Sequence, residues 1–145
     1  SNLSGASAER RFINHGFKAV QIGASAWTAE ALKHTMPASV FSRSTECHNQ
    51  DKVSMGTIAA RDCLRVLELT EQVAAALMLA SVQGVRLRQM QDSANPVALM
   101  PPLEDFMARV AEHSDFLDED RPLEAELRQM TELIRQDYWE LYPDA

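Results

Sequence analysis

The chain has 145 residues, of which 46% are hydrophobic and 24% are charged, so it can form one domain around one sizeable core. Acidic residues outnumber basic ones by 21 to 14, and the formal net charge of −7 disfavours nucleic acid binding through a basic surface. The apolar run over residues 73–85 is shorter than the roughly 20 residues that a membrane-spanning helix needs. We therefore expect neither nucleic acid nor a membrane as a partner.

The opening of the chain, residues 1–11, is polar and lacks the apolar segment of a signal peptide. We interpret it as a frayed or extended lead-in. The two cysteines, Cys47 and Cys63, are expected to remain free thiols, as in a reducing cytoplasm, and a disulfide between them is the less favoured alternative.

Apolar residues recur at steps of three and four over four stretches, which predicts four helices and no strand. The first covers residues 17–33, and Pro37 prevents its continuation. The second, over residues 57–90, is by far the longest. Two shorter helices follow, over residues 103–113 and 122–141. The expected fold class is therefore all-α, with long antiparallel helices.

The long helix over residues 57–90 differs between its two halves. Ser54 is its best N-cap candidate, with Asn49 as an alternative. The first half is amphipathic, whereas residues 73–85 are apolar on nearly all sides and need cover all round. A chain of this size offers few elements for that purpose. We therefore expect other subunits, or a further polypeptide segment, to complete an oligomeric helical bundle around it.

The stretch between the first two helices, residues 41–56, is the most polar and least periodic part of the chain. Connections between helices are usually shorter, and long polar loops are often part of a functional site. Apolar residues such as Phe41 and Val53 stand at its ends, and disordered segments lack such anchors. The pattern predicts an ordered, irregular functional loop.

Several motifs lie in and around this loop: Pro37-Ala38-Ser39-Val40, His48-Asn49-Gln50-Asp51, Val53-Ser54-Met55-Gly56-Thr57 and Ala59-Ala60-Arg61. Their order and spacing resemble the C-terminal signature of the aromatic amino acid ammonia-lyase and aminomutase family, whose members carry the electrophile methylidene-imidazolone (MIO). The resemblance runs from about Phe12 to about Leu87, and Asp120-Arg121-Pro122-Leu123 matches a second family segment.

The resemblance implies that residues 1–145 are a single helical C-terminal fragment of a larger, tetrameric lyase or aminomutase. Within it, residues 1–11 would be the lead-in, residues 12–90 the core helices with the signature loop, and residues 91–145 the C-terminal helices. The implied reaction is loss of ammonia from an aromatic L-amino acid, or a 2,3-shift of its amino group.

The chain departs from the family in what it lacks. Family members form MIO from an Ala-Ser-Gly triad, but Ala6-Ser7 and Ala24-Ser25 are each followed by alanine. The family's catalytic tyrosine and carboxylate-binding arginine also have no counterpart here. The resemblance therefore implies no cofactor and no catalytic residue in this chain. MIO would come from a missing N-terminal part, which would be its partner, and the isolated chain would be inactive.

Gln50 is the first candidate for a substrate-binding residue. In the family this position holds glutamate in relatives that act on histidine and glutamine in those that act on phenylalanine or tyrosine. A carboxylate can pair with an imidazole, whereas opposite an apolar or phenolic ring it would be a buried charge without a partner. An amide avoids that cost. The alternative is that Gln50 only satisfies backbone groups of the loop.

Two neighbours, Asn49 and Glu46, are further candidates through the same resemblance. Asn49 would help to hold the pocket wall, or else cap a helix. Glu46 would face the substrate ring and favour tyrosine over phenylalanine, or else pair with Arg43 or Lys52 at the surface. His48 could act as a proton shuttle, although a role in bridging loop backbone groups is favoured.

Two other kinds of function remain as alternatives. A metal-dependent hydrolase is disfavoured because Glu46, Cys47, His48 and Asp51 are too close in sequence to converge on one ion. A cysteine nucleophile formed by Cys47 and His48 fails for a similar reason, since neighbouring side chains point apart. A non-enzymatic helical oligomerisation module is the stronger rival, and it would need only further copies of itself.

Overall fold

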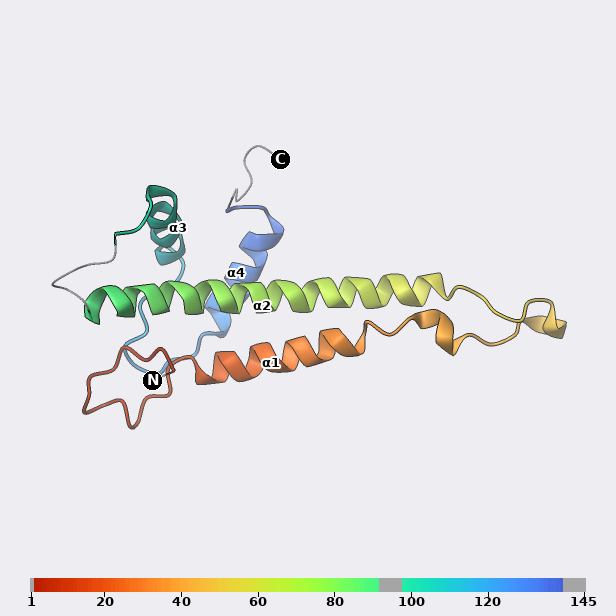
Figure 1. Ribbon diagram of the computed structural model, residues 1–145, viewed down its shortest axis with the longest axis horizontal. Helices are drawn as coiled ribbons and strands as arrows, with labels where there is room; N and C mark the ends of the chain where they lie inside the picture. The colour runs from red at the N-terminus through yellow and green to blue at the C-terminus, as the bar shows by residue number, and fades with distance from the viewer. Residues whose placement is uncertain (1, 92–97, 140–145) are drawn as a thin grey trace.

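The computed structural model describes residues 2–91 and 98–139 (Figure 1). Its elements, in chain order, are α1 (Lys18–Lys33), the 3-10 turns η1 (Ala38–Phe41) and η2 (Glu46–His48), α2 (Gly56–Gln91), α3 (Pro101–Ala111) and α4 (Glu124–Arg135). No strand occurs in these two ranges. The predicted all-α fold class is confirmed.

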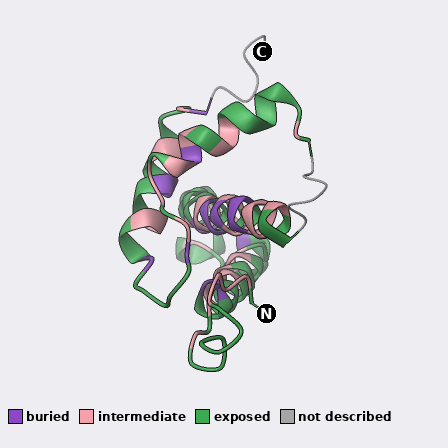
Figure 2. Cartoon of the chain, turned by 90° about the vertical axis from the view of Figure 1, so that its left-hand side faces the viewer, coloured by how far each residue is buried: buried purple, intermediate pink, exposed green. Residues whose placement is uncertain are grey.

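Helix α2 is the centre of the molecule and contacts every other α-helix. α1 runs antiparallel along it, and α3 and α4 cross its later part (Figure 1). Seen almost end-on, α2 lies between α1 on one side and α3 and α4 on the other (Figure 2). The core is formed by buried apolar side chains from all these segments: Phe17, Val20, Ala75, Ala76, Leu79, Val82, Val110, Leu117, Leu123, Met130 and Trp139.

The apolar second half of α2 is covered in part by this chain itself. Ala75, Ala76, Leu79 and Val82 are buried, most of the other residues of this half are half-buried, and Leu77 is exposed. This chain therefore covers the inner side of this half, and the expectation that other polypeptides complete the cover stays a prediction. Segments that are far apart in the sequence pack against this helix, which periodicity in the sequence does not reveal.

The lead-in is held in place by the core, contrary to the sequence-based interpretation. Gly5 N–H donates to the Leu117 carbonyl at 2.9 Å, and Phe17 N–H donates to the Asn2 carbonyl at 2.7 Å. The Leu3 side chain packs against the core. A Cβ on Gly5 would lie 2.4 Å from the Phe116 ring, so the close packing at this position requires glycine.

Gln83 joins α2 to the two segments that pack across it. Its side chain is 3% exposed. Its Nε2 donates to the carbonyls of Leu3 at 3.0 Å and Leu117 at 2.8 Å, and its Oε1 accepts from Leu117 N–H at 3.1 Å. The three backbone groups lie in irregular segments and therefore have no partner within a helix. One buried amide gives each of them a hydrogen bond.

The segment Asp120–Leu123, which resembles a family motif, docks the connection before α4 against the start of α1. The Asp120 carboxylate accepts from His15 N–H at 2.6 Å and Gly16 N–H at 2.8 Å, and Asp120 N–H donates to Asn14 Oδ1 at 2.7 Å. These backbone donors lower the pKa of Asp120, because they favour its charged form. The motif has a structural role in this chain.

Several helix ends differ from the sequence predictions. α2 begins at Gly56, and Met55 precedes it, with its carbonyl accepting from Ala59 N–H at 3.1 Å, so neither Ser54 nor Asn49 is the N-cap. α3 begins at Pro101 and ends at Ala111, two residues earlier at each end than predicted. α4 ends at Arg135, short of the predicted 141, and residues 140–141 lie outside the described ranges.

The buried amide of Gln83 leads to a stability prediction. Gln83→Met keeps the side-chain length but leaves the Leu3 carbonyl and the Leu117 N–H without their partner, whereas the Leu117 carbonyl still accepts from Gly5 N–H. We expect the free energy of unfolding to fall by about 3 kcal/mol, since each unsatisfied buried group costs about 1–3 kcal/mol. Urea denaturation measures this, with exposed Ser81→Ala on the same helix as the control. A loss below about 0.5 kcal/mol would contradict the role of Gln83.

Candidate functional site

The candidate site is the signature loop, residues 42–55, between η1 and α2. It lies at the far end of the α1–α2 pair, away from α3 and α4 (Figure 1). The prediction of an ordered, irregular loop between the first two helices is confirmed. Its geometry comes from two closures across its base and a tight turn at its tip.

The base of the loop is closed by the hydroxyl of Ser42. This side chain is 1% exposed, and its Oγ accepts from Val53 N–H at 2.8 Å. The second closure joins Thr45 and Gln50. Thr45 N–H donates to the Gln50 carbonyl at 2.9 Å, and Gln50 N–H donates to Thr45 Oγ1 at 2.9 Å. The backbone N–H and carbonyl of Gln50 thus close the loop, which leaves its side-chain amide for other contacts.

The tip is a 3-10 turn with two residues in the left-handed region. Cys47 has φ of 50° and His48 has φ of 56°, and neither is glycine. Such a conformation costs about 1–2 kcal/mol per residue. Two backbone bonds hold it: His48 N–H donates to the Thr45 carbonyl at 3.1 Å, and Asn49 N–H donates to the Glu46 carbonyl at 3.0 Å. Backbone strain of this kind is common at binding sites.

The structure places all three predicted substrate-binding residues on this tip. Glu46, Asn49 and Gln50 belong to one closed turn and are exposed. Among the described residues Glu46 forms no ion pair, and Arg43 donates instead to the carbonyls of Phe41 and Ser42. The surface pair weighed from the sequence is therefore not formed.

The remaining polar candidates of the loop have simple roles. His48 Nδ1 lies 3.1 Å from Ser44 Oγ, so its ring bonds a side chain and does not bridge backbone groups as expected. Cys47 and Cys63 are both free and exposed. Within residues 2–91 and 98–139, no three His, Cys, Asp or Glu side chains are grouped as a metal site would require.

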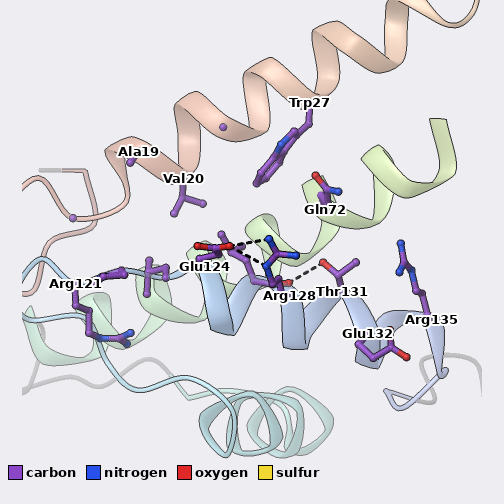
Figure 3. A pocket seen from close by; sticks show the side chains of 15 residues that line it. Ala19, Val20, Trp27, Gln72, Arg121, Glu124, Arg128, Thr131, Glu132 and Arg135 are labelled. Carbon is purple, nitrogen blue, oxygen red and sulfur yellow. Dashed lines mark hydrogen bonds and ion pairs between the residues drawn. The ribbon is translucent and has the colours of Figure 1, made fainter. Parts of the chain in front are cut away.

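A groove of about 770 Å³ lies elsewhere, between α1, α2 and α4 (Figure 3). Trp27, Val20 and Leu127 are among its apolar lining residues, and none of the predicted site residues lines it. The sequence analysis did not anticipate this groove. The regular spacing of three arginines, at 121, 128 and 135, is the sequence feature that could have indicated it.

The arginines of this groove are engaged in ion pairs. Arg128 lies 2.8 Å from Glu124, Arg121 lies 2.6 Å from Glu126, and Arg135 lies 2.6 Å from Glu71. The hydrogen bonds that Arg121 donates to the Glu126 carboxylate raise the pKa of Arg121. Because these charges are already paired, the groove has no free cation among them for an anionic ligand. We interpret the groove as a gap in the packing between helices and not as a binding site.

The fold and the site together define a class of protein. It is an all-helical chain in which two long antiparallel helices are joined by a polar, strained loop. The family model described as aromatic amino acid lyase matches residues 2–112. The chain belongs to this family, and the resemblance predicted from the sequence is confirmed. No helix in the described part of the chain is both long and apolar enough to cross a membrane.

Two relatives illustrate the similarity of sequence. The chain is 35% identical over 129 residues to a histidine ammonia-lyase from Caenorhabditis elegans, which covers 88% of this chain and 18% of the relative. It is 35% identical over 127 residues to a tyrosine ammonia-lyase from Cereibacter sphaeroides, covering 86% of this chain and 23% of the relative. The chain thus spans about a fifth to a quarter of the length of these relatives.

Solved structures show the same fold. A histidine ammonia-lyase from Trypanosoma cruzi superposes with a TM-score of 0.76 and 30% identity, over 88% of this chain and 24% of that one. A tyrosine aminomutase from Streptomyces globisporus superposes with a TM-score of 0.79 and 27% identity, over 94% of this chain and 24% of that one.

The closure of the loop leads to a prediction about its order. Thr45→Val removes the acceptor of Gln50 N–H and keeps the side-chain shape. We expect amide hydrogen exchange at Gln50 to become about fivefold faster, which corresponds to a lost hydrogen bond of about 1 kcal/mol. Thr45→Ser retains the hydroxyl and is the matched control. Equal exchange in the two variants would show that Thr45 Oγ1 does not close the loop.

Proposed function

We propose that this chain is the C-terminal part of an aromatic amino acid ammonia-lyase or aminomutase, and that its signature loop forms one wall of the active site. The observation that carries the proposal is the gathering of Glu46, Asn49 and Gln50 on one strained, closed tip in a member of this family. The reaction would be loss of ammonia from an aromatic L-amino acid, or a shift of its amino group.

The site would be shared with a second stretch of polypeptide. A small-molecule site encloses most of its ligand, whereas the three polar side chains at the tip are exposed and do not line the groove between α1, α2 and α4. The relatives are several times longer than the matched part, so they contain segments that could cover the loop. These segments are the proposed partner of this chain.

The residues of this chain do not fit as the source of the MIO electrophile. Neither Ala-Ser pair is followed by glycine. Ser25 lies inside α1, where its Oγ donates to the Gln21 carbonyl at 3.0 Å, and the helical backbone around it is already hydrogen-bonded. We therefore place MIO in the second stretch of polypeptide and assign no catalytic step to the residues of this chain.

The proposed role of the loop is recognition of the substrate ring. The Gln50 side chain is a neutral donor and acceptor, which suits an aromatic ring better than a carboxylate would. The Glu46 carboxylate lies in the same turn and can accept a hydrogen bond from a phenolic hydroxyl. Tyrosine is therefore the preferred substrate and phenylalanine the second. The relatives include enzymes named for histidine and for tyrosine, so their names do not decide between them.

A homo-oligomer, a tetramer as in the family resemblance, is also part of the proposal. An uncharged strip follows the outer side of α2 at steps of three and four, through Cys63, Leu67, Thr70, Ala74, Leu77 and Ser81. Leu67 is 53% exposed and Leu77 is 65% exposed. An exposed strip of this kind is typical of a helix that packs against a further helix.

The rival function, an oligomerisation module without activity, rests on the same strip. It does not account for the strained polar tip, because assembly through α2 does not need Glu46, Asn49 or Gln50 in one turn. The two functions differ in whether the loop supports catalysis when the rest of an enzyme is present.

A chimera tests the proposal directly. The matched segment of the Cereibacter sphaeroides tyrosine ammonia-lyase is replaced by this chain, and formation of the arylacrylate product is followed by its ultraviolet absorbance. We expect activity with tyrosine and phenylalanine from the chimera, and none from the isolated 145-residue chain. A folded, assembled chimera without activity would favour the oligomerisation module, and product from the isolated chain would contradict the shared site.

The active chimera allows a specificity prediction for Gln50. Gln50→Glu places a charge where the ring is expected, which costs binding of tyrosine and phenylalanine but allows pairing with an imidazole. We expect the ratio of kcat/KM for histidine to that for tyrosine to rise at least about tenfold, equivalent to about 1.4 kcal/mol. Asp51→Asn, beside it in the loop, is the control. An unchanged ratio would remove Gln50 from the proposed site.

A further inference from the structure

The signature loop is carried by an arm, which we define as residues 30–68. It consists of the end of α1, η1, the loop and the first part of α2. In Figure 1 the arm extends beyond α3 and α4. The nearest link from α4 is the ion pair between Arg135 and Glu71, which lies just past the arm. The position of the loop therefore depends on how the two halves of the arm hold each other.

Apolar packing contributes little to that hold. Between residues 30 and 68 only Ala38 and Ser42 are buried. Large apolar side chains on both helices face outward, with Leu32 65% exposed and Leu64 63% exposed. Buried apolar contact is what normally fixes the packing of two helices. The buried core that joins Val20 of α1 to Ala76 and Leu79 of α2 lies outside the arm, so another interaction must hold the two helices together within the arm.

Two polar contacts cross between the helices of the arm. The Arg65 guanidinium donates from Nε at 2.8 Å and from its terminal nitrogen at 2.7 Å, both to Glu30 Oε1, and from its other terminal nitrogen to Glu68 Oε2 at 3.0 Å. One turn nearer the loop, His34 Nδ1 lies 3.1 Å from Asp62 Oδ1. The planar fork of Arg65 defines an orientation, which a single point charge does not.

We propose that Arg65, held by Glu30 and Glu68, is a positioning residue that holds the two helices of the arm together and thereby sets the place of the loop tip. It touches no substrate group and acts through the loop. Its relevance to catalysis rests on the proposed function, whereas its effect on the arm does not. About nine helical residues, or roughly 14 Å, separate it from the start of α2, so a small change at Arg65 is enlarged at the tip.

The chemistry of this contact gives the arm a salt dependence. The side chains of Arg65 and Glu30 are each 40% exposed, so dissolved ions reach the pair. Screening at high ionic strength weakens such a contact, because the Debye length falls from about 10 Å at 0.1 M to about 3 Å at 1 M. The rest of the molecule also has exposed ion pairs, but its packing is held in addition by a buried apolar core, which screening does not weaken.

A distance measurement on the chain itself tests the proposal. Spin labels are placed on the native Cys47 at the tip and on Ala125→Cys at the exposed start of α4, in a Cys63→Ser background diluted with unlabelled chain. Arg65→Met and Glu30→Gln are each expected to broaden the distance distribution at least about twofold, and so is 1 M salt. Arg61→Met, on the exposed side of the same helix, is the control and is expected to leave it unchanged.

Two outcomes would overturn the proposal. One is an unchanged distribution in both variants, and the other is equal broadening in the Arg61→Met control. Because Glu30→Gln is nearly isosteric, it separates loss of the ion pair from loss of folding, which far-ultraviolet circular dichroism checks in the same samples.

The chimera provides the catalytic readout. There we expect Arg65→Met to raise KM about tenfold with a smaller change in kcat, and Arg65→Lys, which lacks the fork, to recover only part of the loss. A tenfold fall of kcat with KM unchanged would contradict a positioning role. An inactive chimera would count against the proposed function, whereas the distance measurement would still decide the role of Arg65.

Discussion

The structure depends on the buried side chain of Gln83. Its amide donates to the carbonyls of Leu3 and Leu117 and accepts from Leu117 N–H, so it joins α2 to two segments that are far from it in sequence. Both segments are irregular, and their buried backbone groups have no helical partner. Without such a bridge the lead-in and the connection before α4 would bury unpaired polar groups against an apolar helix, which is costly.

The buried core that this bridge supports and the loop that carries the candidate site lie in different parts of the molecule. The core cluster uses residues from α1 to Trp139, all of them outside the arm that carries the loop. The arm is held by hydrogen bonds and ion pairs of Ser42, Thr45 and Arg65. Polar contacts fix orientation with little burial, and they allow the tip to keep Glu46, Asn49 and Gln50 exposed.

The two groups of family motifs accordingly have different physical meanings in this chain. The motif around Asp120 is used internally, because its carboxylate accepts from the backbone of His15 and Gly16 and so docks the start of α1. The motif around Gln50 closes its own loop through backbone bonds and offers its side chains outward. The likeness in fold to a histidine ammonia-lyase and to a tyrosine aminomutase extends over 88% and 94% of the chain, respectively.

The sequence by itself determined the all-helical class, the approximate ranges of four helices, the ordered loop and the family. Each of these depends on local periodicity, on proline positions or on short motifs, which need no knowledge of distant contacts. Its errors at the helix ends are local and small. The partial cover of α2 by this chain, the docked lead-in and the role of Gln83 all arise from residues far apart in sequence, so only the tertiary structure decided them. The same holds for Arg65, whose partner Glu30 lies on another helix.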